Sequence, residues 1–166
     1  QGVVVAVLGH HGRLAHGSSL RATTVRPVPT IVFVHAHPDD EASQTSGSMA
    51  RAAAEGSRVV VVFATNGEHG EVPDDLVPGE SLIERRRAEA ERSAAALGVA
   101  RVEWLGYSDS GMTGWEQNAH AASLHQADVR DAGLRLAAIL DRENADIVVG
   151  YDWHGGYGHP DHVKVH

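Results

Sequence analysis

Apolar residues along this chain gather in short runs rich in valine and isoleucine, and these runs alternate with longer stretches of helical character. Runs of about four to eight β-branched or aromatic residues are typical of strands, and continuous runs predict strands buried on both faces of a parallel sheet. Two of the intervening stretches end at a glycine, as many helices do. The first predicted strand begins at Ile31, and three more span Arg58–Thr65, Arg101–Leu105 and Ala145–Tyr151. The predicted helices span Thr45–Glu55, Ser81–Leu97 and Asp128–Glu143.

This succession of strands and helices predicts an α/β fold, with a Rossmann-like, mostly parallel sheet flanked by helices. Two polar stretches that contain glycine, Asn66–Gly79 and Gly106–His125, follow predicted strands and are expected to be loops at one edge of the sheet. Connections as long as the second are usually functional or disordered in a compact domain, and we expect this one to form a substrate lid.

Residues 1–30 show no such periodicity, apart from one short apolar run at Val3–Leu8. We expect them to form an extension outside the fold, followed by one domain over residues 31–166. A secretory signal is the alternative, but no basic segment precedes the apolar run and no small-residue cleavage site follows it. A further alternative is that these residues are upstream sequence translated from a misplaced start codon, which would also lack periodicity.

Composition narrows the classes of function. The chain has 166 residues, of which 42% are hydrophobic and 22% charged, and its formal net charge is −8. Its longest basic run is Arg85–Arg87, so a nucleic-acid partner is not expected. The absence of cysteine excludes thiolate chemistry and leaves histidine and carboxylate as metal ligands. No apolar run approaches the ~20 residues of a membrane span, so we expect a soluble protein.

Polar chemistry stands at the end of the first predicted strand, where the sequence IVFVHAHPDDE changes from apolar to polar. Pro38 cannot donate to a strand ladder and is favoured in the first turn of a helix, so we expect a helix to begin there. His37 and Asp40 then share one face, where imidazole and carboxylate form a ligand pair for a divalent cation, commonly zinc. The alternative is a helix cap, because Asp39, Asp40 and Glu41 favour a first turn without binding anything.

The same residue types recur far down the chain, in the sequence GGYGHPDH at Gly155–His162. His-Pro-Asp occurs at residues 37–39 and again at residues 159–161, and the second copy also follows a predicted strand. The carboxyl ends of parallel strands meet at one crevice, where α/β proteins bind ligands, so we expect the two motifs to face each other. The glycines allow the backbone to approach a ligand closely, and Tyr157 is expected to line a sugar pocket.

These two motifs, together with Asp109-Ser110-Gly111-Met112, resemble the PIG-L or LmbE-like family of zinc-dependent N-acetylglucosamine deacetylases. The resemblance covers Ile31–His166 and is to the actinobacterial branch that contains the mycothiol-pathway deacetylase and amidase. It implies an enzyme that removes an acetyl group from an N-acyl amino sugar. The implied metal ligands are His37, Asp40 and His162. The implied general base is Asp39, and the residue facing the oxyanion and the leaving group is His159. The implied sugar contacts are Arg86 and Asp109.

Amide hydrolysis at neutral pH needs a stronger nucleophile than water and a group that holds the developing oxyanion. Zinc lowers the pKa of bound water from 15.7 to ~7 and polarises the carbonyl, provided that coordination positions stay open. In this interpretation Asp39 takes the proton of the water. His159, kept protonated by Asp161 or another carboxylate, stabilises the oxyanion and protonates the amine. We therefore count Asp161 among the catalytic residues.

Two rival functions stay open at this point. A non-haem iron oxygenase also uses two histidines and one carboxylate, and His37-Pro38-Asp39 satisfies its His-x-Asp spacing. The alternation of strands and helices argues against it, because such oxygenases are mostly antiparallel β proteins. A metal-binding or sugar-binding domain without turnover would use the same ligands but would leave Asp39 and His159 without a duty. Zinc is the expected cofactor, and Fe2+ is the alternative.

The resemblance also implies a small-molecule substrate and a cytoplasmic location. The family continues well beyond its HPDH motif, whereas this sequence ends at His166, soon after the proposed ligand His162. We therefore expect the domain to be incomplete at its C-terminus.

Overall fold

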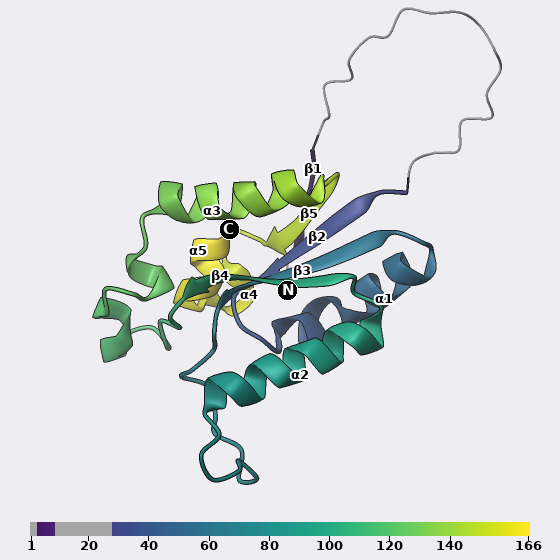
Figure 1. Ribbon diagram of the computed structural model, residues 1–166. Helices are drawn as coiled ribbons and strands as arrows, with labels where there is room; N and C mark the ends of the chain where they lie inside the picture. Colours follow the sequence, from purple (N-terminus) through teal and green to yellow (C-terminus); the bar gives the residue numbers. More distant parts are fainter. Residues whose placement is uncertain (1–2, 9–27) are drawn as a thin grey trace, which may run out of the picture.

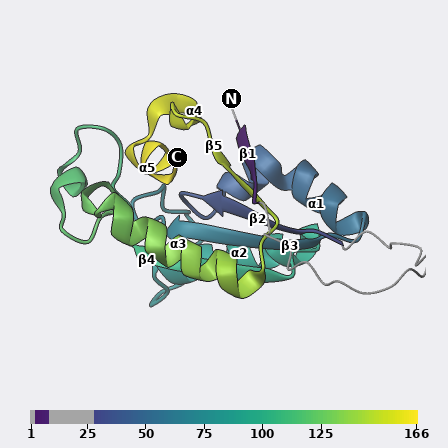
Figure 2. The same ribbon diagram turned by 90° about the horizontal axis from the view of Figure 1, so that it is seen from above.

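The computed structural model describes residues 3–8 and 28–166, which form one mixed sheet with helices on both faces (Figures 1 and 2). The strands, in the spatial order β1-β5-β2-β3-β4, are β1 (Val3–Val7), β2 (Thr30–His35), β3 (Arg58–Thr65), β4 (Arg101–Tyr107) and β5 (Ile147–Tyr151). The helices are α1 (Ser46–Ala54), α2 (Leu82–Leu97), α3 (Val129–Glu143) and the short α4 (Gly155–Gly158) and α5 (Pro160–Val165). Strands β2 to β5 run parallel, so the predicted α/β class is confirmed.

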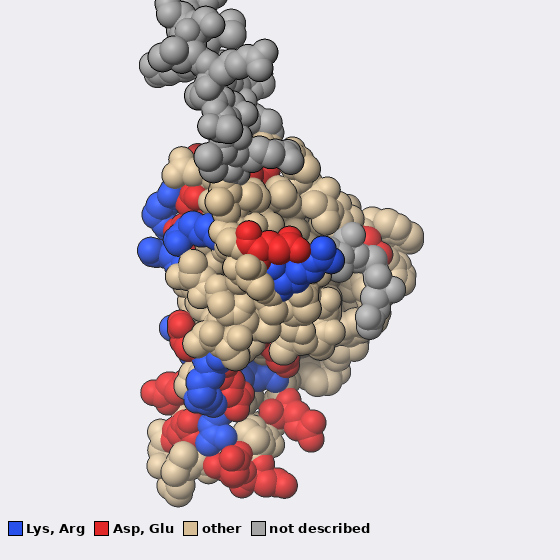
Figure 3. Space-filling view, turned by 90° about the vertical axis from the view of Figure 1, so that its right-hand side faces the viewer, with Lys and Arg blue, Asp and Glu red and all other residues tan. Residues whose placement is uncertain are grey.

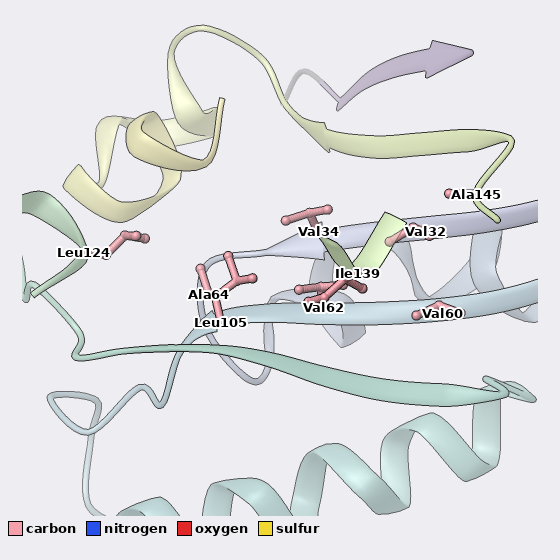
Figure 4. Close-up of a cluster of buried hydrophobic side chains, with 9 residues drawn as sticks. All are labelled: Val32, Val34, Val60, Val62, Ala64, Leu105, Leu124, Ile139 and Ala145. Atoms are coloured by element: carbon pink, nitrogen blue, oxygen red, sulfur yellow. The ribbon is translucent and has the colours of Figure 1, made fainter. Parts of the chain in front are cut away.

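Two apolar layers hold the sheet between its helices, with α3 on one side and α1 and α2 on the other (Figure 1). Successive side chains of β2 and β3 point to opposite faces, so each layer receives half of them. The layer beneath α3 contains the side chains drawn in Figure 4: Val32, Val34, Val60, Val62, Ala64, Leu105, Leu124, Ile139 and Ala145. The opposite layer packs Phe33, Val61 and Phe63 against Met49 of α1 and Ala90 of α2. Both faces are buried, as the continuous apolar runs predict.

Strand β1 lies at the edge of the sheet, where it pairs with β5 in antiparallel register, Val3 opposite Tyr151. The lack of periodicity predicts that residues 1–30 lie outside the fold, but Val3–Val7 lie within the sheet. Consecutive valines favour an extended conformation, and β5 offers them a free edge to pair with. The rest of that segment, residues 9–27, lies outside the described residues.

Local sequence signals set the ends of the longer helices. At the start of α2, Ser81 Oγ accepts the Glu84 N–H at 3.2 Å, and the Glu84 carboxylate accepts the Ser81 N–H at 2.8 Å. This helix ends at Gly98, which adopts a left-handed conformation with φ of 73°. The carboxylate of Asp128 accepts two backbone N–H groups at the start of α3. The predicted ends of α1, α2 and α3 lie within one residue of the observed ones, and for α2 and α3 these local signals account for the agreement.

Charged side chains on the face shown in Figure 3 lie in mixed groups, with basic and acidic residues side by side. Ion pairs also join separate elements of the fold: Arg58 Nη2 lies 2.7 Å from Glu143 Oε2, and Arg142 Nη2 lies 2.8 Å from Glu103 Oε1. These pairs connect β3 and β4 to α3. Within the described ranges, no helix combines the length and the apolar character that a membrane crossing requires.

Candidate active site

The ends of β2, β4 and β5 meet at one edge of the sheet, beside a cavity of about 230 Å³. Among the predicted site residues, those that line this cavity are His37, Asp39, Asp40, Arg86, Asp109, Tyr157 and His159. The remaining two, Asp161 and His162, lie beneath the cavity wall and are fully buried. The structure therefore brings the two sequence motifs together.

The first motif does not enter a helix at Pro38, so that prediction is wrong. Pro38 and Asp39 form a turn, and the helical turn η1 (Glu41–Thr45) begins after it. Asp39 has φ of 127°, a conformation that costs a residue other than glycine about 1–3 kcal/mol and that gathers at functional sites. The turn forms because Asp40 Oδ2 accepts the His37 N–H at 2.9 Å, which brings these two side chains together without a helix.

The second motif is held by the start of α5. His159 precedes the helix, and its Nδ1 accepts the Asp161 N–H at 3.1 Å, while Pro160 occupies the first helical position. His162 then points inward and is completely buried. Its Nδ1 lies 3.1 Å from the carbonyl oxygen of Gly155 in α4, so Nε2 is the nitrogen left for another partner.

Three atoms of the predicted metal ligands form a nearly regular triangle. His37 Nδ1 lies 3.4 Å from Asp40 Oδ2 and 3.3 Å from His162 Nε2. Asp40 Oδ2 lies 3.3 Å from His162 Nε2. Tetrahedral coordination with bonds of about 2.0–2.1 Å separates two ligand atoms by about 3.3–3.4 Å. The triangle therefore has the dimensions of three corners of a tetrahedral zinc site.

The side chains of this triangle are also anchored through their remaining polar atoms. His37 Nε2 lies 3.0 Å from Asp161 Oδ2, and Asp40 Oδ1 accepts from Gln44 Nε2 at 2.8 Å. The carbonyl contact of His162 Nδ1 completes the set. Histidine ligands of metals usually donate their second N–H to a carboxylate or carbonyl in this way, which fixes the ring orientation. The residues present thus fit a bound divalent metal.

Other donor groups surround His37 as well. Donor atoms of His37, His159 and His162 lie within 4.8 Å of one another, and so do those of His37, Asp109, His159 and Asp161. Asp109 and Asp161 approach His37 at Nε2, with distances of 3.6 and 3.0 Å, so they act on the side of the ring away from the triangle. We therefore favour the triangle as the metal centre and these carboxylates as its outer support.

Histidines and carboxylates of the site lie so close together that their attraction outweighs the effect of burial on their pKa values. Burial lowers the pKa of His37, but the carboxylates of Asp109, Asp161 and Asp40 outweigh it and raise that pKa well above its ordinary value. Burial raises the pKa of Asp40, yet His162 and His37 hold it well below its usual range. His37 likewise holds the pKa of Asp109 low against the effect of burial. Both carboxylates are therefore held in the ionised form, which is the form in which Asp40 can bind a metal.

Asp161 does not keep His159 charged, which corrects the sequence-based expectation. The Asp161 carboxylate accepts the Ser110 N–H at 2.9 Å and the Ser110 hydroxyl, and it lies against His37. Burial, helped by the neighbouring His37 imidazole, lowers the pKa of His159 to about 4, so its ring is neutral. Because Nδ1 accepts a backbone N–H, the ring carries its proton on Nε2.

Asp39 and Arg86 form one wall of the cavity. Arg86 Nη2 lies 3.4 Å from Asp39 Oδ2, and Nη1 donates to the Pro38 carbonyl at 3.3 Å. The guanidinium passes so close to Gly70 that a Cβ built there would lie 2.1 Å from Nη2. Burial raises the pKa of Asp39, and Arg86 opposes this shift. The Asp39 side chain is 65% exposed, so water screens both effects.

Some side chains of the site carry no signal in the sequence. Tyr151 ends β5, and its hydroxyl donates to Asp40 Oδ2 at 2.8 Å while its ring stacks on His162. His69 lines the cavity from a stretch predicted as a loop, and Trp115 lines it from the stretch expected to form a lid, but the sequence singles out neither residue. A tyrosine at the end of a buried strand has the pattern of a core residue, and only its contacts with both motifs show its place in the site.

Comparisons with known proteins match most of the chain. The family model described as PIG-L, GlcNAc-PI de-N-acetylase, matches residues 32–166. Over 146 residues the chain is 47% identical to 1D-myo-inositol 2-acetamido-2-deoxy-alpha-D-glucopyranoside deacetylase of Thermobifida fusca (strain YX), an alignment that covers 82% of this chain and 51% of that protein. The chain spans about half the length of the curated relatives it matches.

Solved structures share the fold. The chain is similar to N,N'-diacetylchitobiose deacetylase from Pyrococcus horikoshii, with a TM-score of 0.62 and 27% identity, over 84% of this chain and 47% of that one. It is also similar to GalB, the 4-carboxy-2-hydroxymuconate hydratase from Pseudomonas putida KT2440, with a TM-score of 0.63 and 24% identity, over 83% of this chain and 52% of that one. The likeness to a hydratase concerns the fold alone, so the chemistry has to be argued from the site.

Proposed function

The chain belongs to the PIG-L family, and from that premise we propose that it hydrolyses the acyl amide of an N-acyl amino sugar such as an N-acetylglucosaminide. Its relatives are named for such reactions, one as the deacetylase of an inositol glucosaminide and one as a diacetylchitobiose deacetylase. The observation that carries the proposal is the triangle of His37, Asp40 and His162, which has the dimensions of a metal site and lies next to Asp39. The cytoplasmic location that the resemblance implies belongs to the same proposal.

The metal in this proposal is zinc, and Fe2+ is the alternative that the same donors accept. Its donors would be His37 Nδ1, Asp40 Oδ2 and His162 Nε2. When bound, zinc supplies a water of lowered pKa and polarises the acyl carbonyl. The remaining requirements, which are proton transfer, oxyanion stabilisation and orientation of the sugar, fall to the side chains of the chain itself.

Asp39 is the proposed general base. Its carboxylate is adjacent in sequence to the proposed ligand Asp40 and lines the same cavity, and the backbone of Asp39 has the unusual φ of 127°. Arg86 Nη2 lies 3.4 Å from one of its oxygens, and the guanidinium opposes the rise in the pKa of Asp39 that burial causes. An ionised carboxylate in this position can accept the proton of the attacking water.

His159 is the proposed donor to the oxyanion. Its neutral ring is fixed by the backbone N–H that Nδ1 accepts, so Nε2–H is the only ring donor. A preoriented donor of this kind acts where negative charge develops on the substrate oxygen. Asp39 and His159 line the same cavity, where the substrate amide is expected to bind. Asp39 can therefore pass the proton that it accepts from water to the departing amine.

Arg86, Asp109 and Tyr157 are the proposed contacts to the sugar. Each lines the cavity, and Tyr157 is 62% exposed at its rim. Arg86 offers guanidinium donors and Asp109 an ionised acceptor, which suits the hydroxyl groups of a sugar. Asp109 is itself oriented by the N–H groups of His69 and Gly111, at 3.3 and 2.8 Å.

The rival functions make different predictions for one variant, Asp39→Asn. We expect this variant to keep stoichiometric zinc and to lose amine release from N-acetylglucosaminides by ~10²-fold or more relative to the unmodified chain. The control is Asp74→Asn, an exposed carboxylate in the loop before α2, which should change neither quantity. Zinc content by metal analysis and amine release by a fluorogenic reaction measure the two effects separately.

Each contrary result has a distinct meaning. Loss of zinc from Asp39→Asn but not from Asp40→Asn means that the two carboxylates are assigned backwards. Zinc binding without any amine release in the unmodified chain favours a metal-binding or sugar-binding domain. Oxygen consumption by an iron-loaded chain in place of amine release favours the oxygenase, although the parallel sheet argues against it.

A further inference from the structure

Tyr151 contacts proposed metal ligands from both motifs. It ends β5, and its side chain is buried. Its hydroxyl donates to Asp40 Oδ2 at 2.8 Å, and its ring stacks on the His162 imidazole with the ring centres 4.3 Å apart and the planes 24° from parallel. A single rigid side chain therefore touches the carboxylate ligand and one imidazole ligand at the same time.

The hydroxyl of Tyr151 has further hydrogen-bond partners besides Asp40. It accepts the Ala36 N–H at 3.0 Å and lies 3.4 Å from His35 Nδ1, and His35 Nε2 lies 2.8 Å from Thr45 Oγ1. The hydroxyl has one proton, and the shorter distance gives that proton to Asp40, so His35 Nδ1 is the donor to the tyrosine oxygen. Thr45 Oγ1 also lies 3.3 Å from Met49 Sδ, but a thioether is the weaker acceptor and His35 Nε2 is nearer, so the Thr45 proton goes to His35. The hydrogen bonds then run in one direction, from Thr45 through His35 and Tyr151 to the carboxylate, and each strengthens the next.

We propose that Tyr151 is a positioning residue that fixes the Asp40 carboxylate and the His162 ring for the metal. This role rests on the proposed metal site. Gln44 holds Asp40 Oδ1 at 2.8 Å, and Tyr151 with the His37 N–H holds Oδ2, so the carboxylate cannot rotate away from the triangle. Removal of partners of this kind typically costs 10–100-fold in metal affinity, which is about the loss expected here.

The test is the zinc affinity of Tyr151→Phe, which keeps the ring that stacks on His162 and removes only the hydroxyl. Competition with a chromogenic chelator should show a dissociation constant about 10–100-fold higher than that of the unmodified chain. The matched control is Tyr107→Phe, whose ring packs on the Arg135 guanidinium at 4.7 Å and should leave the zinc affinity unchanged. A second measurement uses Co2+, because its visible absorption reports ligand geometry and should differ between Tyr151→Phe and the unmodified chain.

The outcomes separate the positioning role from the metal site itself. A merely structural tyrosine lowers the melting temperature of the metal-free protein but leaves both the zinc dissociation constant and the Co2+ spectrum unchanged, and that result overturns the role while the metal site stands. If the unmodified chain binds no zinc, the role and the proposed metal site fail together. If Tyr151→Phe does not fold, Thr45→Val decides: a rise of at least ~2-fold in the zinc dissociation constant supports the relay, and no change overturns it.

Discussion

Replacing Gly155 by alanine tests how closely the segment before α5 holds the ligand His162. Gly155 has φ of 63°, and a Cβ built there would lie 2.7 Å from both His162 Cβ and Val163 N and 2.9 Å from the His162 carbonyl carbon. Two of these three atoms belong to the backbone, so no change of rotamer can relieve the contact. Ordinary contact begins at 3.4 Å, and 3.4 minus 2.7 means that α5 must move by about 0.7 Å.

The expected cost has two parts. A side chain at positive φ costs ~1–2 kcal/mol, and overpacking against a fixed neighbour typically adds ~1–3 kcal/mol. We therefore expect the free energy of unfolding of the metal-free protein to fall by ~2–5 kcal/mol in Gly155→Ala. His162 Nε2 moves with α5, and a displacement of this size takes it out of the triangle, so the zinc dissociation constant should rise by at least ~10-fold.

Gly158→Ala is the matched control, because Gly158 lies in the same segment and has φ of 85°, but a Cβ there would have no atom within 4 Å. This control should lose only the ~1–2 kcal/mol of the backbone conformation and should keep its zinc affinity. Urea denaturation and chelator competition measure the two quantities. If Gly155→Ala binds zinc as tightly as Gly158→Ala does, the packing of α5 does not set the position of His162 and the reasoning fails.

Other contacts give three more measurable outcomes. Ser81→Ala removes the capping box of α2 and should lower the free energy of unfolding by ~1 kcal/mol in urea, and an unchanged midpoint would contradict that role of the cap. Val62→Ala, in the fully buried core, should cost ~2–3 kcal/mol, whereas Val7→Ala, at a side chain that is 76% exposed, should stay within ~0.5 kcal/mol. Burial lowers the pKa of His35 from 6.5 to about 4, so the unfolded chain binds a proton here that the folded chain excludes between these values. The contribution of His35 to stability is therefore full above about pH 6.5 and is lost as the pH falls to about 4, and NMR signals of a charged His35 ring in the folded protein at about pH 5 would contradict this.

The elements that the sequence predicts well are those decided by local chemistry. Strand β3 is a continuous apolar run because both of its faces are buried, and α2 carries a capping box at one end and Gly98 at the other. The two histidine motifs stand out because each follows an apolar run and contains the same residues, His-Pro-Asp. Parallel strands then bring those motifs to the same edge, which is a property of the fold class and needs no knowledge of side-chain contacts.

The features that the sequence does not predict depend on competition or on distant partners. Proline favours a helix start at Pro38, but capture of the His37 N–H by the Asp40 carboxylate forms a turn first and delays the helix. Asp161 stands two residues after His159 in the same motif, yet its carboxylate binds Ser110 and His37 from other elements. Long-range contacts of this kind leave no periodicity or spacing in the sequence.

Anomalous diffraction at the zinc absorption edge, from crystals of this chain grown with zinc, tests the central claim most directly. The account predicts one peak at about 2.0–2.2 Å from His37 Nδ1, Asp40 Oδ2 and His162 Nε2, because those atoms already form the face of a tetrahedron. A peak bound instead by Asp109 and Asp161, or no peak at the triangle at all, would contradict it.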